Sequence, residues 1–104
     1  MEISKYDWKK YREKISGWQE AYMEKLCMEY VAILNNSGSN ASERFWTVEQ
    51  RIKRDKRCGG VLIEMRRSHA IFDIAQLVAD DVITFEDLSE FSAELQDAIK
   101  WILH

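Results

Sequence analysis

The sequence predicts an all-α protein, a bundle of about four helices in which the first helix is much the longest. Apolar residues recur at steps of three or four along the first third of the chain, as on one face of a helix. No stretch alternates apolar and polar residues as a half-buried strand does, and the 104 residues contain no proline. The length is that of one domain, so residues 1–104 are expected to form a single helical domain.

The first helix is predicted over residues 4–35. It starts at a capping-box-like pair, Ser4 with Asp7 three residues later. A stripe of large apolar side chains then follows at helical spacing: Trp8, Tyr11, Ile15, Trp18, Tyr22, Leu26, Tyr30 and Ile33. The helix is expected to end at a linker over residues 36–40, which is rich in turn-forming residues and has no apolar side chain.

Two central helices are predicted, over residues 41–56 and 60–80. The first begins at Asn40, which has a glutamate three residues later, and it is expected to stop before the two adjacent glycines at 59 and 60. The second is inferred from a long apolar run in which alternation is scarce, a pattern that favours a buried helix over a strand. A break at Ser68 stays open, because serine can cap a new helix.

The last helix is predicted over residues 84–103. Thr84 and Asp87 form a capping pair, and Ile83 and Leu88 stand around it at the positions of a hydrophobic staple. A kink at Ser92 is left open.

The predicted length of the first helix points to a partner. About 32 helical residues would extend about 48 Å, whereas a compact chain of 104 residues is only about 33 Å across. The helix is therefore expected either to bend near Gly17 or to project and bury its stripe in another chain. The candidate partner-binding residues are Trp8, Tyr11, Ile15, Trp18 and Tyr22. Pairing of two such stripes would give a homodimer.

The net charge of −3 conceals a strong asymmetry along the chain. Residues 1–42 carry six basic and six acidic groups, which cancel. Residues 43–67 carry eight basic against four acidic groups, a net charge of +4, whereas residues 68–104 carry one base against eight acids, a net charge of −7. Such a chain can pair its own regions or offer two unlike surfaces to partners.

A cluster of basic residues lies at the end of the second predicted helix: Arg51, Lys53, Arg54, Lys56 and Arg57. It offers positive charge to phosphates, with Trp46 as a stacking platform. The pI of about 5.4 and the lack of a helix-turn-helix or RNA-binding signature argue against nucleic acid. The interpretation preferred here is a solvated basic face that pairs with the acidic last helix.

The acidic stretch at residues 80–88 resembles the second half of an EF-hand calcium loop. Aligning Asp87 with the closing ligand places Gln76 and Val78 at the first two ligand positions, and Asp81 where the loop needs glycine. The stretch is therefore predicted to be an inter-helix turn whose Val82 and Ile83 enter the core.

The remaining reactive side chains predict no catalytic or metal site. Cys58 is expected to be a plain loop thiol and Cys27 a small core residue. His69 and Asp73 lie one helical turn apart but lack a third ligand, and no catalytic triad or glycine-rich phosphate loop can be assembled. We therefore expect neither an enzyme, nor a metal site, nor a cofactor, nor a small-molecule substrate.

The expected compartment is the cytoplasm. No window approaches the roughly 18 apolar residues of a membrane span, and the start has neither the apolar run nor the cleavage site of a secretory signal. Two cysteines are too few for a disulfide scaffold.

Motifs over a little more than half of the chain carry a resemblance. They are Phe45-Trp46-x-x-Glu49-x-Arg51-Ile52-Lys53-x-Asp55-Lys56, Gly60-Val61, and Val82-Ile83-Thr84-Phe85-x-Asp87-Leu88-x-x-Phe91-Ser92-x-Glu94-Leu95. This pattern resembles a group of small uncharacterised proteins of Gram-positive bacteria, some of which carry a "multidrug transporter" label. The resemblance implies helical bacterial proteins without an established activity. No membrane span in the sequence supports the transporter label.

These observations together predict a non-catalytic cytoplasmic module for protein–protein interaction or regulation, which associates with itself or with another protein through its first helix. One alternative is a nucleic-acid-associated regulator that uses the basic cluster at 51–57. Another is an inhibitor of a nucleic-acid enzyme encoded on a mobile element, comparable to anti-CRISPR proteins. Its acidic C-terminal third would then mimic phosphates, an analogy that rests on size and charge alone.

Overall fold

Helix α1 (Lys5–Leu34) is the element on which all the others pack, in a computed structural model that describes residues 1–104. Three further helices follow it, α2 (Ala41–Asp55), α3 (Ala70–Ala79) and α4 (Ala93–Ile102), with short 3₁₀ helices at Arg67–His69 and Phe85–Leu88. The predicted all-α fold with about four helices and a long first helix is confirmed.

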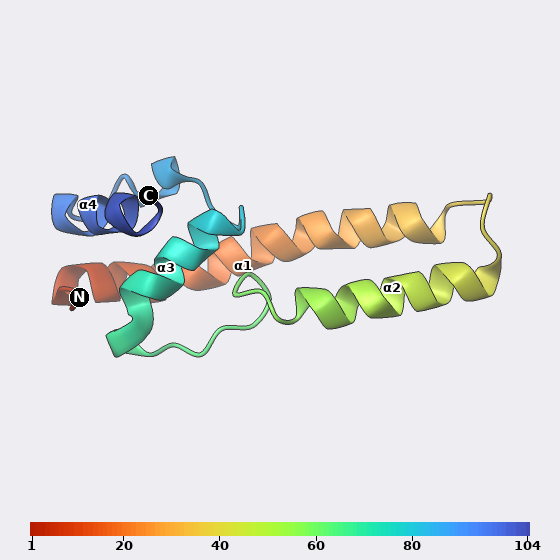
Figure 1. The fold of residues 1–104 in the computed structure, drawn as a ribbon, viewed down its shortest axis with the longest axis horizontal. Helices are drawn as coiled ribbons and strands as arrows, with labels where there is room; N and C mark the ends of the chain where they lie inside the picture. Colours follow the sequence, from red (N-terminus) through yellow and green to blue (C-terminus); the bar gives the residue numbers. More distant parts are fainter.

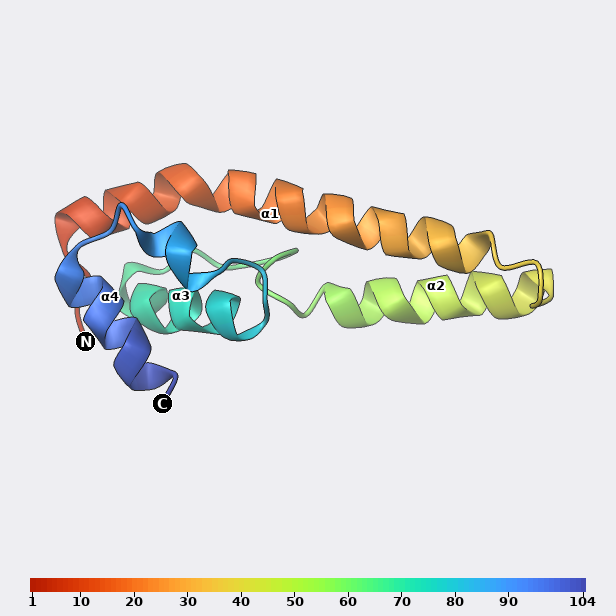
Figure 2. The same cartoon turned by 90° about the horizontal axis from the view of Figure 1, so that it is seen from above.

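The molecule has two parts (Figure 1). In the first, which we call the head, α3 and α4 pack against the first half of α1. In the second, the arm, α2 runs antiparallel to the second half of α1. Figure 2 shows that α1 extends through both parts with a gentle curve. The dimensions of 51 × 25 × 23 Å and the radius of gyration of 16.5 Å reflect this projecting arm, since a compact chain of this length would have a radius near 13 Å.

The predicted starts of the first two helices are confirmed. The Ser4 side chain accepts a hydrogen bond from the Asp7 N–H at 3.1 Å, and the Asn40 side chain accepts one from the Glu43 N–H at 2.9 Å. Each bond satisfies a backbone donor that the first turn of a helix leaves without a partner. The linker between the helices lies at residues 35–40, close to the predicted 36–40.

The prediction of a helix over residues 60–80 is wrong in its first half. Residues 62–66 are extended, and α3 begins only at Ala70, after the 3₁₀ turn that contains Ser68. In the extended segment Ile63 and Met65 pack against the core while the residues between them are exposed. This period of two is that of an extended chain, and it places two apolar side chains on the core without the backbone of a helix.

The predicted helix over residues 84–103 is also divided. The Thr84–Asp87 capping box is present, as predicted, but it starts only the 3₁₀ helix Phe85–Leu88. The chain then bends, and α4 starts afresh at Ser92, whose hydroxyl accepts a hydrogen bond from the Leu95 N–H at 3.2 Å. The kink left open at Ser92 is therefore a complete break.

A buried carboxylate explains this break. Asp7 is only 2% exposed, and its Oδ1 accepts a hydrogen bond from the Ser92 N–H at 2.9 Å. Its Oδ2 accepts hydrogen bonds from the hydroxyls of Ser92, at 2.5 Å, and Ser4, at 3.0 Å. The carboxylate thus lies where α1 and α4 both begin, and a negative charge is favoured at the N-terminus of a helix. This contact joins segments 85 residues apart.

The hydrophobic core lies in the head. Its buried side chains come from all the head elements: Ile3, Tyr11, Ile15, Ala70, Ile71, Ile74, Ala75, Leu77, Ile83, Leu88, Phe91, Leu95 and Ile99. Leu26 is the only buried apolar residue of the arm. Most of the stabilisation from apolar burial therefore comes from the head.

We predict that Asp7→Ala lowers the free energy of unfolding by about 3 kcal/mol. It removes three hydrogen bonds to a charged acceptor and leaves the partly buried Ser92 N–H without a partner. Urea unfolding followed by circular dichroism measures the change. Ser4→Ala, which removes one of the three bonds, is the matched control and should cost about 1 kcal/mol. An Asp7→Ala loss no larger than that of the control would contradict the role of Asp7 in joining the two helices.

Candidate functional site

The predicted partner-binding stripe lies inside the head. Tyr11 is fully buried and Ile15 is 8% exposed, while Trp8, Trp18 and Tyr22 are partly buried. The prediction that these residues lie outside the cover of their own bundle is therefore wrong. The stripe is covered because α3, α4 and the turns between them pack on the first half of α1, and α2 packs on the second half.

Aromatic contacts show how the stripe enters the core. The rings of Trp8 and Tyr11 are 6.0 Å apart, those of Tyr11 and Trp18 6.3 Å, and those of Trp18 and Phe91 6.1 Å. These separations are typical of packed aromatic pairs. Tyr22 lies instead against Gly60, where an added Cβ would overlap its ring.

The five residues of the basic cluster differ in their contacts, because only some of them form ion pairs. Arg51 is largely covered and forms an ion pair with Glu29 of α1 at 2.7 Å, and Arg54 contacts its neighbour Asp55 at 3.3 Å. Lys53, Lys56 and Arg57 form no ion pair. The interpretation that the cluster pairs with the acidic last helix is wrong, because its carboxylate partners belong to α1 and α2.

The two helices of the arm meet through a polar seam. Its centre is Asp55, which is 6% exposed and is the only buried residue of α2. The Tyr30 hydroxyl donates a hydrogen bond to Asp55, and Arg51 lies 3.7 Å from the same carboxylate. The Arg51 guanidinium also lies 5.7 Å from the centre of the Tyr30 ring, within the range of a cation–π contact.

Contacts in this seam raise the pKa values of two of its residues. Burial, together with the hydrogen bond to the Asp55 carboxylate, raises the pKa of Tyr30 to about 12. The hydrogen bond with Glu29 raises the pKa of Arg51 above its usual value. Both groups therefore keep their protons firmly, and they serve as donors that hold the arm together.

Because polar residues occupy the seam, the apolar residues of α2 lie at its edge. Phe45 is 61% exposed and Ile52 is 41% exposed, and across from them on α1 Leu34 is 45% exposed. With Val48 and the charged residues Glu49, Lys53 and Lys56 they line a groove of about 560 Å³, to which α1 contributes Leu34 and α2 the other six residues. Such a row of exposed apolar side chains on one face of a protein is typical of an interaction site.

The sequence pattern contains a signal for this groove that the first helix obscures. Within α2 the apolar residues Phe45, Val48 and Ile52 recur at helical spacing. The charged residues Arg51 and Asp55 recur with them on an adjacent line. A helix that carries both lines can bury only one of them against a single neighbour. The structure places the charged line against α1.

The turn at residues 80–84 is the predicted inter-helix turn. Asp81 has a φ of 58°, in the left-handed region where a turn reverses the chain, and Ile83 is buried in the core. Val82 is partly buried and packs against the same core, so the predicted placement of both residues is confirmed. No group of three or more histidine, cysteine or acidic side chains comes together in a way that could hold a metal ion.

The two cysteines lie apart, and one prediction about them is wrong. Cys27 is exposed rather than in the core, because it lies beside the seam and not on it. Cys58 is partly buried in the loop after α2, with its Sγ 3.9 Å from Asp80. His69 bonds its neighbour Ser68, while partial burial raises the pKa of Asp73.

The high-pH stability of the arm tests the seam. The pKa of Tyr30 rises from about 10 in the unfolded chain to about 12 in the folded one. Its contribution to stability is therefore complete below pH 10 and is lost as the pH rises towards 12. We predict that Tyr30→Phe flattens the fall in the free energy of unfolding over this range, as measured by urea unfolding at a series of pH values.

Tyr22 provides the internal comparison, because burial together with the Cys58 hydrogen bond raises its pKa to about 12 as well. Some of the fall should therefore remain in the Tyr30→Phe variant. A variant whose curve runs parallel to that of the wild type would contradict the hydrogen bond to Asp55.

None of the helices is both long enough and apolar enough to cross a membrane. Comparisons of the chain with protein families, with curated proteins and with solved structures find no match. The resemblance of the segment from Phe45 to Leu103 to small Gram-positive proteins therefore stays a prediction.

Proposed function

We propose that this protein is a non-catalytic interaction module that binds an apolar helical surface of a protein through the groove of its arm. The observation that carries the proposal is the way α2 packs. Its one buried side chain is the carboxylate of Asp55, whereas its apolar residues Phe45 and Ile52 stay exposed. A helix stabilised within its own chain normally buries its apolar line instead.

Two exposed aromatic residues, Phe45 and Trp46, lie at the end of the arm farthest from the head and support a protein partner. The rings of Phe45 and Trp46 are 5.0 Å apart and nearly perpendicular, and Trp46 is 59% exposed. Exposed aromatic residues of this kind supply much of the binding energy in protein interfaces. They also lie on a rigid two-helix scaffold, which reduces the entropy lost on binding.

The division of the basic cluster favours protein over nucleic acid as the partner. A phosphate-binding surface needs several free cations along one line. Here Arg51 and Arg54 already contact carboxylates, and Lys53 and Lys56, which form no ion pair, stand beside the four apolar side chains of the groove and the carboxylate of Glu49. We place the module in the cytoplasm, a proposal supported by its two free cysteines.

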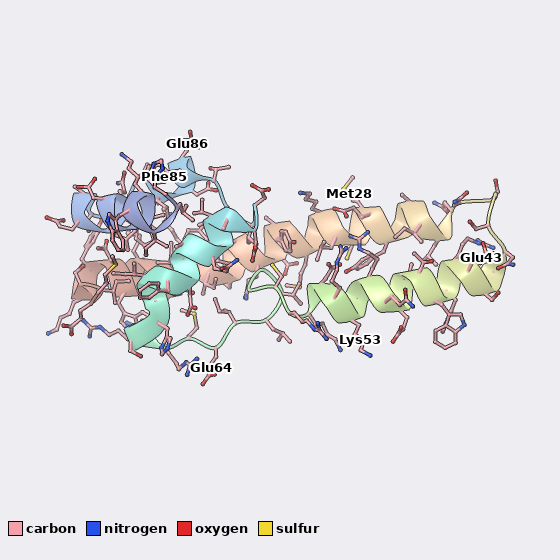
Figure 3. All side chains as sticks on the ribbon, viewed as in Figure 1. Met28, Glu43, Lys53, Glu64, Phe85 and Glu86 are labelled. Carbon is pink, nitrogen blue, oxygen red and sulfur yellow. The ribbon has the colours of Figure 1, made fainter.

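Site-specific photo-crosslinking tests this function. A benzophenone amino acid at position 45 should give a protein adduct in the native cell, whereas the same group at position 28 should not. Met28 is the matched control because it is 67% exposed, and Figure 3 shows it pointing away from α2. The adduct should form again when the purified partners are mixed and irradiated, and it should form equally well in about 1 M salt, since apolar contacts are not screened.

Two outcomes would contradict the proposal. One is an adduct with nucleic acid that no longer forms when irradiation is carried out at high salt, as expected for phosphate contacts. The other is equal crosslinking from positions 45 and 28, which would mean that the groove does not select its partner.

A further inference from the structure

The groove of the arm is apolar at one border and basic at the other. Val48 lies seven residues, or about two turns, before the buried Asp55, so it stands on the side of α2 that faces α1. With Leu34 of α1 it forms the apolar border. Figure 3 shows Lys53 on the side of α2 that faces away from α1, where it forms the basic border.

The groove also changes along the length of α2. From the end farthest from the head towards the head, the lining residues follow each other as Phe45, Val48, Glu49, Ile52, Lys53 and Lys56. The three apolar residues of this series span about two turns of the helix, and Lys56 lies one turn beyond them. The end of the groove next to the head therefore carries its positive charge.

This positive charge has no counter-charge within the chain. Lys53 and Lys56 are both exposed, and none of the ion pairs of the structure includes either of them. Their neighbours Arg51 and Arg54 differ, because each contacts the carboxylate of Asp55. The two lysines are thus available to carboxylates of a partner that lies in the groove.

From this complementarity we infer that the groove binds an amphipathic helix of another protein, whose apolar residues lie along Phe45, Val48 and Ile52 and whose carboxylates lie beside Lys53 and Lys56. The inference rests on the proposed function and adds the charge and the placement of the partner.

The form of the groove favours a helical partner over an extended one. The apolar residues of α2 recur at i, i+3 and i+7, the spacing with which helices dock in grooves. A helix also satisfies its own backbone donors and acceptors. An extended peptide would need the edge of a sheet for its backbone, and this chain has no strand to offer one.

A membrane surface is the main competitor, because a face with apolar, aromatic and basic side chains can also bind lipids. Two features favour the protein helix. The groove is a hollow of about 560 Å³, which receives projecting side chains better than it matches a flat bilayer. The carboxylate of Glu49 lies among the lining residues, where anionic headgroups would repel it.

Three designed peptides test the inference by fluorescence anisotropy. Each is a helix as long as α2, 15 residues, with leucines at i, i+3 and i+7 and a flank of glutamates, glutamines or lysines. The wild-type protein should bind the glutamate peptide about tenfold more tightly than the lysine peptide, with the glutamine peptide between them, because two exposed ion pairs each contribute a few-fold. This preference should vanish in about 1 M salt. Equal binding of the three peptides in low salt, or no binding of the glutamate peptide, would overturn the inference.

A charge reversal tests the placement of the carboxylates. The double variant Lys53→Glu/Lys56→Glu should invert the preference, so that the lysine peptide binds more tightly than the glutamate peptide. Misfolding cannot produce this gain. The matched control Lys9→Glu/Lys25→Glu changes the net charge by the same amount at exposed positions outside the groove, and it should keep the wild-type preference. The same preference in both double variants would contradict the placement.

A milder variant should strengthen binding. Glu49→Gln removes the one carboxylate of the groove, so it should bind the glutamate peptide about twofold more tightly. Weaker binding of this peptide by the variant would count against carboxylates in the groove.

Vesicles of phosphatidylcholine, with and without phosphatidylserine, test the lipid alternative. The wild-type protein should remain unbound in flotation with both. Binding to the phosphatidylserine vesicles that is lost in Lys53→Glu/Lys56→Glu and displaced by the glutamate peptide would assign the groove to a membrane instead.

The experiments separate this inference from the proposed function. If the benzophenone at position 45 captures a protein but the three peptides bind equally, the interaction module stands and the acidic helix is excluded. If position 45 captures no protein, both proposals fall. The affinity that charge screening removes, about threefold, does not reduce an adduct formed at saturating concentrations.

Discussion

The length of α1 is the constraint on which the rest of this structure depends. A helix of 30 residues extends about 45 Å, and the remaining elements of the head cover only its first half. The second half needs its own cover, and the chain supplies it by returning along α1 as α2. The elongated shape, the two-part architecture and the exposed face of the arm all follow from this one length.

The cover that α2 provides is unusual in its chemistry. Asp55, Tyr30 and Arg51 hold the two helices through hydrogen bonds and an ion pair, and Leu26 is the only apolar residue buried between them. Buried polar contacts of this type demand specific geometry but add little net stability. They fix the rotation of α2 about its axis, and this rotation sets Phe45 and Ile52 along the groove.

Local signals in the sequence predicted the helix starts correctly, because a cap at Ser4, Asn40 or Thr84 involves residues only three positions apart. The break before α4 was underestimated because its cause, Asp7, lies 85 residues away. The extended segment at 62–66 was misassigned as helix, although the polar residues Glu64 and Arg66 that flank Met65 carried the signal of alternation.

For the candidate site too, local sequence signals were reliable, whereas features that depend on residues far apart in the sequence were not predicted. The spacing of Trp8 and Trp18 identifies the apolar face of a helix, but their assignment to a partner-binding surface was wrong. The sequence does not say whether this face is covered by the same chain or by another, because that depends on where α3 and α4 return. The groove was missed because a periodic apolar line on α2 predicts burial, and only the structure shows that charged residues take the buried position.

The contact between Asp7 and Ser92 also has a consequence for the order of folding. The arm is built from residues close in sequence, joined by a linker of six residues, so its contacts can form early. The contact that joins α4 to α1 can form only after Ser92 has left the ribosome and reached Asp7. During synthesis the arm can therefore form before the core of the head is complete, and its groove is then open to other chains while the head is still unfolded.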